Sequence, residues 1–300
     1  MRLVQQVLII PINRKNMFFP KFLRTSLMPS LSFFSRLMMM GMTTFLLSAC
    51  DLIDYHPYDT HVSGAHDINA RNIKVIEQMC EGRDSLSFVL ISDTQRWYDE
   101  TEKAVKSINS RTDIDFVIHC GDISDFGVTR EFELQRDILQ KLRVPYVVLL
   151  GNHDCLGSGA DVYRYIFGNP NFSFTAGDLH VVCLNTNAFE YDYSTDIPDF
   201  TFIRNDREAV PSGVRRTVVA MHAQPLSEQF NNNVSQLFEY EIRKYPGLSF
   251  CLCGHGHSTQ VNDWFDDGVL YYECAAAKSR EYIVFKLHKD GGYSYEVVHY

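Results

Sequence analysis

The sequence predicts one α/β domain that extends from about residue 83 to the end of the 300-residue chain. Two observations support it. As far as Leu150, continuous apolar runs of strand length alternate with amphipathic segments of about 10 to 15 residues, which is typical of βαβ units whose parallel sheet is buried on both faces. Beyond Leu150 short strand-like runs dominate, and no internal repeat, low-complexity tract or second linker divides them.

The elements are expected in a definite order. Helices are expected at 68–80, 98–109, 129–142 and 233–244. The residues Gly177 and Asp178 separate two short apolar runs and predict a hairpin. The expected strands are SLSFVLIS, DFVIHC, PYVVLL, FSFTA, HVVCLNT, RRTVVAMH, LSFCLCG, VLYYECA, EYIVFKL and YSYEVVH.

Composition and charge exclude two classes of protein. With 45% hydrophobic and 22% charged residues the chain can build a core, so it is not a disordered protein. Residues 1–49 contain six basic residues and no acidic one; the other 22 basic and 37 acidic residues carry a formal net charge of −15. A body this acidic repels phosphate backbones, so general nucleic-acid binding is not expected.

The N-terminal segment predicts export and lipid attachment. The uncharged run 37–49 is too short to span a bilayer but has the length of a signal-peptide apolar region. It ends in Leu47-Ser48-Ala49-Cys50, which resembles the bacterial lipobox and implies that Cys50 is lipidated. We therefore expect a signal peptide at 1–49, a lipid anchor and tether at 50–82, and a lipid-anchored protein of the bacterial cell envelope. A buried apolar helix with an incidental Cys50 is the alternative, and Met28 is a possible true start.

The remaining seven cysteines predict a structural role. Most lie in apolar strand-like runs, where free Cys behaves as a small hydrophobe. Cys251 and Cys253 alternate within one expected strand, and no second Cys pair at finger spacing accompanies them. A zinc finger is therefore not expected.

Five apolar runs end in polar side chains that can bind metals. In an open α/β sheet, ligands bind at the carboxyl ends of the strands. A single Asp after a strand is usually a turn residue or a helix cap, but five such ends in order indicate a site. The ends carry Asp93 and Gln95, then Asp122 and Asp125, then Asn152, His153 and Asp154, then His222, and finally His255 and His257.

These motifs resemble those of the calcineurin-like metallophosphoesterase superfamily, which are D-x-H, G-D-x-x-D, G-N-H-D/E, a lone His after a strand, and G-H-x-H. The match covers 93–257, and four of the five motifs are intact. The resemblance implies a four-layer α/β fold, a two-sheet β-sandwich flanked by helices. It also implies a dinuclear metal centre.

The resemblance assigns a metal role to each position. It gives Asp93 and His257 to the first metal; Asn152, His222 and His255 to the second; and Asp122 to both. Oxygen and imidazole donors suit Mn, Fe, Zn or Mg. Two such divalent cations about 3.5 to 4 Å apart can clamp a phosphoryl group and hold a hydroxide nucleophile between them.

Two further residues have a catalytic role by the same resemblance. His153 faces the substrate as an acid or charge stabiliser, and Asp154 orients it and keeps it cationic. Asp125 is expected to cap the following helix or to support the site without touching metal.

The first motif departs from the family pattern, because Gln95 stands where His is usual. An amide oxygen is a poorer ligand than imidazole, so Gln95 is either a weak metal ligand or a bystander, and the metal identity is open. Next to it, Arg96 could take a phosphate oxygen and Trp97 could stack on a base or sugar, or both could be ordinary surface residues. The long segment 186–200 is also expected to serve function.

The leading hypothesis is an envelope metallophosphoesterase that hydrolyses a phosphoester small molecule. A pyrophosphatase acting on nucleotide-linked or lipid-linked diphosphates would need the same metals. A non-catalytic binding lipoprotein of the same fold is the alternative from a different class, and only Gln95 favours it.

Overall fold

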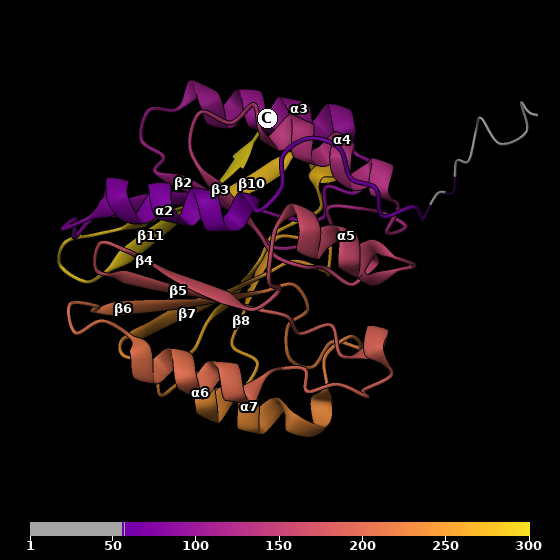
Figure 1. Ribbon diagram of the computed structural model, residues 1–300. Helices are drawn as coiled ribbons and strands as arrows, with labels where there is room; N and C mark the ends of the chain where they lie inside the picture. Colours follow the sequence, from indigo (N-terminus) through magenta and orange to yellow (C-terminus); the bar gives the residue numbers. More distant parts are fainter. Residues whose placement is uncertain (1–55, 57) are drawn as a thin grey trace, which may run out of the picture. The chain divides into compact units, whose positions relative to one another are not determined.

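Two mixed β-sheets stacked face to face organise the part of the chain that the structure, a computed structural model, describes, namely residue 56 and residues 58–300 (Figure 1). The first sheet has the order β11 (Tyr293–His299), β10 (Glu281–Leu287), β1 (Leu86–Ile91), β2 (Phe116–His119), β3 (Tyr146–Val148). The second has the order β4 (Phe172–Ala176), β5 (Leu179–Leu184), β6 (Arg216–Met221), β7 (Leu248–Cys253), β9 (Tyr271–Glu273), β8 (Gln260–Asn262). The expected signal peptide and Cys50 lie outside the described residues.

Parallel pairing in both sheets confirms the prediction made from the continuous apolar runs. β1, β2 and β3 are parallel to one another, and so are β5, β6, β7 and β9. β10 returns antiparallel to β1, and β11 pairs antiparallel with β10 at the sheet edge. In the second sheet β4 and β8 are antiparallel edge strands. Parallel strands place their carboxyl ends at the same edge, so the loops that follow them meet.

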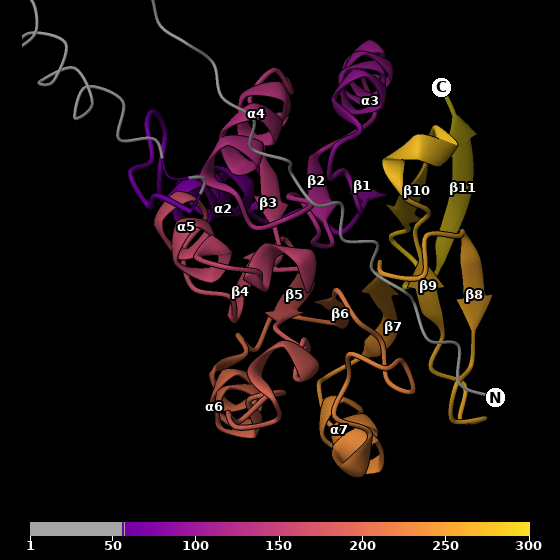
Figure 2. The ribbon, with the colours of Figure 1, turned by 90° about the vertical axis from the view of Figure 1, so that its right-hand side faces the viewer.

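Helices cover the outer faces of the two sheets, which gives the expected four layers (Figure 2). α3 (Tyr98–Ser110) and α4 (Thr129–Leu139) lie on the first sheet, and α6 (Phe200–Ala209) and α7 (Ser235–Ile242) lie on the second. The strands alternate accordingly: Phe88 and Leu90 pack between the sheets, and Val89 packs toward the helices. The α/β sandwich predicted from the family resemblance is confirmed.

α2 (Ile68–Cys80) has the bounds that the sequence predicted. It packs against β3 and β4, burying Ile76 and Cys80. Asn69 donates through Nδ2 to the carbonyl of Val148 at 2.8 Å and accepts from its amide at 2.9 Å, so it completes the edge of the first sheet as a neighbouring strand would. The helix therefore belongs to the packed unit, whereas the sequence pattern grouped residues 50–82 as a tether.

Other elements depart from the sequence-based expectation. The helices α5 (Gly159–Ile166) and α6 were not expected, and α6 begins at the residue where the long segment 186–200 ends. That segment contains one short 3₁₀ helix, η3 (Phe189–Tyr191). Three other 3₁₀ turns, η2 (His153–Cys155), η4 (Asn232–Val234) and η5 (Ala277–Ser279), connect strands and helices. The cysteines of the described part are all free, and six of the seven are buried, which confirms their structural role.

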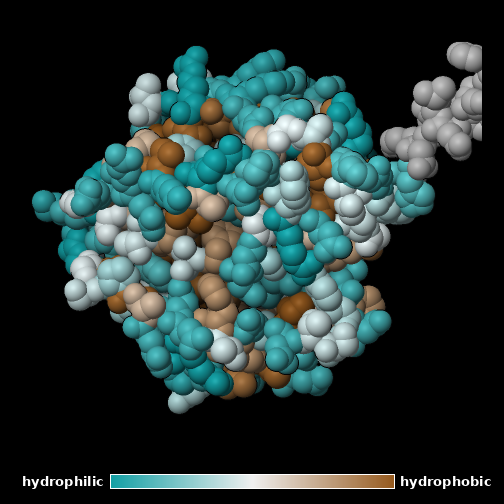
Figure 3. Space-filling view, viewed as in Figure 1, coloured by the Kyte–Doolittle hydropathy of each residue, from teal (hydrophilic) through white to brown (hydrophobic). Residues whose placement is uncertain are grey.

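The surface agrees with the acidic, polar composition. On the face shown in Figure 3, hydrophobic side chains reach the surface in separate patches between hydrophilic ones. Among the described residues, no helix has the length and apolar character that crossing a membrane requires.

Candidate metal centre

The loops after five parallel strands meet at one edge of the two stacked sheets. Each donor residue lies one to four positions beyond the last residue of its strand, so the rigid strand fixes the position of the donor. The first sheet contributes three oxygen donors and the second contributes three imidazoles. These donors are Asp93 after β1, Asp122 after β2, Asn152 after β3, His222 after β6, and His255 and His257 after β7.

Backbone hydrogen bonds join these loops directly to one another. The amide of Asp93 donates to Gly121 at 3.0 Å, and the amide of Gly254 donates to His222 at 3.0 Å. The amide of His255 donates to the Asp93 carboxylate at 3.1 Å, and this bond ties the two sheets together. The positions of the donors are therefore fixed by main-chain contacts as well as by side chains.

Four of the donor residues have left-handed backbone conformations. The φ angles are 51° at Asp93, 58° at Asp122, 74° at His255 and 59° at His257. Non-glycine residues rarely adopt this region, and clusters of it are typical of functional sites. Gly151 has a different constraint, because a Cβ there would lie 2.1 Å from the Asp122 amide nitrogen. The backbone at these residues is thus locally strained, and this conformation directs their side chains toward one point.

One group of donors corresponds to the expected second metal. The Oδ1 atom of Asn152 lies 2.9 Å from His222 Nε2 and 3.1 Å from His255 Nδ1. Asp122 Oδ1 lies 3.4 Å from the same His222 nitrogen. The three side chains assigned to this metal therefore converge with the expected bridging carboxylate beside them.

A second group surrounds Asp93. Its Oδ1 atom lies 3.2 Å from His257 Nε2. One ligand atom each from Asp93, Asp122 and His222 fall within 4.8 Å of one another, which brings the two groups into a single centre. Gln95 is buried and donates through Nε2 to Asp122 Oδ2 at 3.2 Å, so it supports the bridging carboxylate; its role as a metal ligand stays a prediction.

Buried carboxylates without a Lys or Arg partner dominate the electrostatics of the centre in the described part of the chain. Burial and the charges of Asp93 and Asp154 raise the pKa of Asp122 well above its usual range. Burial also works to raise the pKa of Asp93, but the hydrogen bond from His257 and the charge of His222 outweigh it and lower that pKa. In the described part of the chain neither carboxylate forms an ion pair with a Lys or Arg; the ionisable groups close to them are imidazoles.

The imidazole of His222 has the protonation state and orientation of a metal ligand. Burial lowers the pKa of His222 to about 4, so this side chain is neutral near pH 7, as a metal ligand must be. Its Nδ1 faces the carbonyl of Cys120 at 2.7 Å, which leaves Nε2 directed toward Asn152 and Asp122. Two buried carboxylates, an amide oxygen and three imidazoles are a donor set that divalent Mn, Fe, Zn or Mg accepts.

His153 lies beside the centre, but a different residue orients it. Its Nδ1 faces the backbone carbonyl of Asp125 at 2.7 Å, and its Nε2 lies 4.0 Å from Asp122 Oδ2. The expected contact from Asp154 is not made. Asp154 is fully buried and accepts from the amides of Ser124 and Gly151, at 2.8 and 2.9 Å, so it holds the loops after β2 and β3 together instead.

Asp125 supports the site, as expected, but it is not the helix cap. The Glu131 side chain accepts from the amides of Phe126 and Val128 and takes that role. The Asp125 carboxylate instead forms an ion pair with Arg96.

The two residues expected to contact substrate lie at the edge of this region. Arg96 pairs with Asp125 and lies 5.6 Å from the centroid of the Phe126 ring. Trp97 immediately precedes α3, with the Lys278 ammonium 5.9 Å from its ring centroid. Neither residue lines the cavity over the metal donors. Their contact with substrate stays a prediction.

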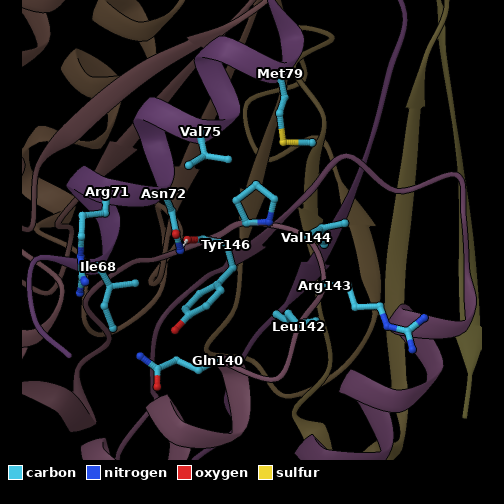
Figure 4. A pocket seen from close by; sticks show the side chains of 11 residues that line it. Ile68, Arg71, Asn72, Val75, Met79, Gln140, Leu142, Arg143, Val144 and Tyr146 are labelled. Atoms are coloured by element: carbon cyan, nitrogen blue, oxygen red, sulfur yellow. Dashed lines mark hydrogen bonds between the residues drawn. The ribbon is translucent and has the colours of Figure 1, made fainter. Parts of the chain in front are cut away.

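A cavity of about 430 Å³ opens over the donors. Asp122, Asn152, His153, His255 and His257 line it together with the polar side chains of Gln224, Ser227 and Glu228. A second cavity, of about 420 Å³, lies between α2 and the start of β3, where Val75, Met79 and Tyr146 face it (Figure 4). None of the described residues that line it has a carboxylate or imidazole, so the first cavity is the one whose lining suits a metal ion.

Sequence reasoning missed two carboxylates beside the donors. Glu228 accepts from His255 Nε2 at 2.8 Å. Glu273, on β9, is buried beneath the Gly254–His257 turn and accepts from Gln260 Nε2 at 2.8 Å. No local pattern marks either residue, because each comes close to the donors only when separate segments of the chain pack together, Glu228 beside His255 and Glu273 beside Gly256.

The fold and the donor set together define a metal-binding α/β sandwich of the phosphoesterase type. The family model of the calcineurin-like phosphoesterases matches residues 86–259, which is more than half of the chain. The chain belongs to this family.

Relatives and solved structures agree with this assignment. An uncharacterised Bacillus subtilis protein, YvnB, is 24% identical over 66% of this chain and 17% of its own length. A Nostoc protein named as a 3′,5′-cyclic-nucleotide phosphodiesterase is 25% identical over 49% of this chain and 57% of its own length. The match thus spans less than two thirds of either relative. The purple acid phosphatase PPD1 of yellow lupin shares the fold, with a TM-score of 0.53 at 12% identity, over 72% of this chain and 54% of that one.

Proposed function

We propose that this protein hydrolyses phosphoric esters with two divalent cations held at the centre around Asp122. The observation that carries the proposal is the pair of buried carboxylates, Asp93 and Asp122, with His222 within reach of both and, among the residues that the structure describes, no Lys or Arg in an ion pair with either. Isolated buried carboxylates are costly unless a cation compensates them. Membership of the phosphoesterase family supports the same conclusion.

The contacts described above support a division of the side chains between the two cations. Asp93 and His257 would hold the first, with Gln95 as a weak additional donor. A larger set would hold the second, namely Asn152, His222 and His255. Asp122 has one oxygen toward His222 and the other toward Gln95, so it can serve both cations. When bound, the cations supply Lewis-acid stabilisation of the phosphoryl group and activation of the attacking water.

His153 would manage the proton on the leaving oxygen. The Asp125 carbonyl accepts from Nδ1, so Nε2 is the atom left to face the cavity. His153 has a half-buried side chain and lines the cavity, so it can reach a bound substrate. A proton held on Nε2 can pass to the departing oxygen, or its charge can stabilise that oxygen.

Metal content and a substrate panel test the proposal together. The purified protein should bind up to two divalent ions per chain after reconstitution with Mn, Zn or Fe, and should then hydrolyse aryl phosphate monoesters or diesters. The panel includes a 3′,5′-cyclic nucleotide, because a relative bears that activity in its name, and a nucleotide-linked diphosphate for the pyrophosphatase alternative. Metal below half an equivalent would contradict the centre. Two bound metals without turnover of any compound would favour the binding-protein alternative.

We further propose that the protein is a lipid-anchored envelope protein, on the basis of the Leu47–Cys50 motif after its apolar run. Replacing Cys50 with Ser should release the protein from the membrane fraction, because the thiol is the point of lipid attachment. Fractionation followed by immunoblotting measures this. If both forms stay equally membrane-bound, or if both are soluble, the proposed anchor is wrong.

A further inference from the structure

His255 differs from His222 and His153 in how its outer ring nitrogen is held. The outer nitrogens of His222 and His153 face backbone carbonyls, those of Cys120 and Asp125. In His255, Nδ1 faces Asn152, so Nε2 is the outer nitrogen, and it lies 2.8 Å from Glu228 Oε1. A side-chain carboxylate therefore holds the outer nitrogen of His255, whereas backbone carbonyls hold those of His222 and His153.

We propose that Glu228 is a positioning residue, which fixes His255 as the tautomer with Nε2–H and with the Nδ1 lone pair directed to the second metal. The inference rests on the proposed metal-dependent function. A carboxylate that accepts from the outer N–H of a histidine ligand fixes its ring and raises its basicity. No other described side chain or backbone group accepts from this nitrogen.

The segment that carries Glu228 is itself held in place. Asn232 bridges it by accepting from the amide of Leu226 at 2.8 Å and donating to the carbonyl of Ser227 at 2.7 Å. On the other side, the carbonyl of Gln229 accepts from the amide of Phe189 at 3.1 Å. A contact fixed from both sides can orient His255 even though the Glu228 side chain is 75% exposed.

The long segment 186–200 gains a role by the same contacts. Its η3 turn supplies Phe189 and also Glu190, whose carboxylate accepts from Gln229 Nε2 at 3.0 Å. The phenol of Tyr193 donates to the carbonyl of Glu228 at 3.5 Å. The segment therefore supports the residue that orients a metal ligand.

The test compares Glu228→Ala and Glu228→Gln with a matched control, Glu208→Ala. Glu208 is an exposed residue of α6 without an ion pair in the described part of the chain, so its replacement reports the loss of one surface charge. Competition of Mn²⁺ or Zn²⁺ against a chelator should show two classes of site in the wild-type protein. Glu228→Ala should weaken one class about tenfold, the lower end of the usual 10- to 100-fold range because Glu228 is exposed. Glu228→Gln keeps an acceptor oxygen, so its metal affinity should lie between those of the wild type and Glu228→Ala.

A second readout needs no metal. Nitrogen-15 spectra of the histidine rings should show His255 as the Nε2–H tautomer in the metal-free wild type and as a tautomer mixture in Glu228→Ala. Unchanged spectra, unchanged affinity at both sites, or an equal loss in Glu208→Ala would each overturn the inference. A wild type that binds no metal would overturn both proposals. The expected affinity change without turnover of any ester would overturn the proposed function alone.

Discussion

Replacing Asp122 with asparagine should remove metal from both sites and abolish turnover. The amide keeps the shape of the carboxylate but loses the charge that both cations would share, so neither site retains its affinity. Loss of metal removes several kcal/mol of transition-state stabilisation, which corresponds to roughly 10³-fold or more in turnover. Metal content by mass spectrometry and initial rates on an aryl phosphate ester measure the two effects.

The control for this change is structural. Asp122 is buried among other acids, so its neutral variant should unfold at a temperature no lower than that of the metal-free wild type. Asp161→Asn, an exposed change on α5, should leave metal content and rate unchanged. If Asp122→Asn retained two metals and more than a tenth of the wild-type rate, Asp122 would not be the bridging residue.

His153→Ala should separate metal binding from proton transfer. Both metals should stay bound, because the imidazole is not among the expected ligands, while turnover should fall by roughly 10² to 10⁴. The loss should shrink for esters with good leaving groups, since an oxygen that departs readily needs less protonation. Rates for a series of aryl esters of graded leaving-group pKa, each at measured metal content, give the answer.

Two results would overturn this assignment of His153. Loss of metal in His153→Ala would show that His153 is a ligand. An equal loss of rate across the ester series would show that it does not act on the leaving group.

Local pattern was sufficient for much of the fold. The helix at Ile68–Cys80 matched to the residue, and the strand at Phe172–Ala176 did as well, because each is marked by its own apolar spacing and flanking turns. α5 and α6 were missed, and length alone does not explain this, because α7 has only eight residues and was predicted. The pairing of β10 beside β1 depends on contacts about 200 residues apart, such as Leu86 with Leu287, for which a single sequence holds no signal.

Most residues of the candidate site could be predicted from the sequence, because they follow strands that local pattern already marks. Strand ends in a parallel sheet converge, so the polar residues after five strands could be grouped without knowing the fold. The orientation of His153 by Asp125 rather than Asp154 could not be predicted. Both acids follow the same kind of strand, and only the approach of two loops decides which one meets the imidazole.

The split origin of the donors has a consequence for the abundance of the protein. Asp93, Asp122 and Asn152 come from one sheet and His222 and His255 from the other, so bound cations would act as a cross-link that exists only in the native state. At about 100 times its dissociation constant, each cation would add about 2.7 kcal/mol to the free energy of unfolding. Where metal is scarce, a larger fraction of chains would be unfolded and therefore open to degradation by proteases. The cell would then contain less of the protein under the same conditions in which its metal centre could not be filled.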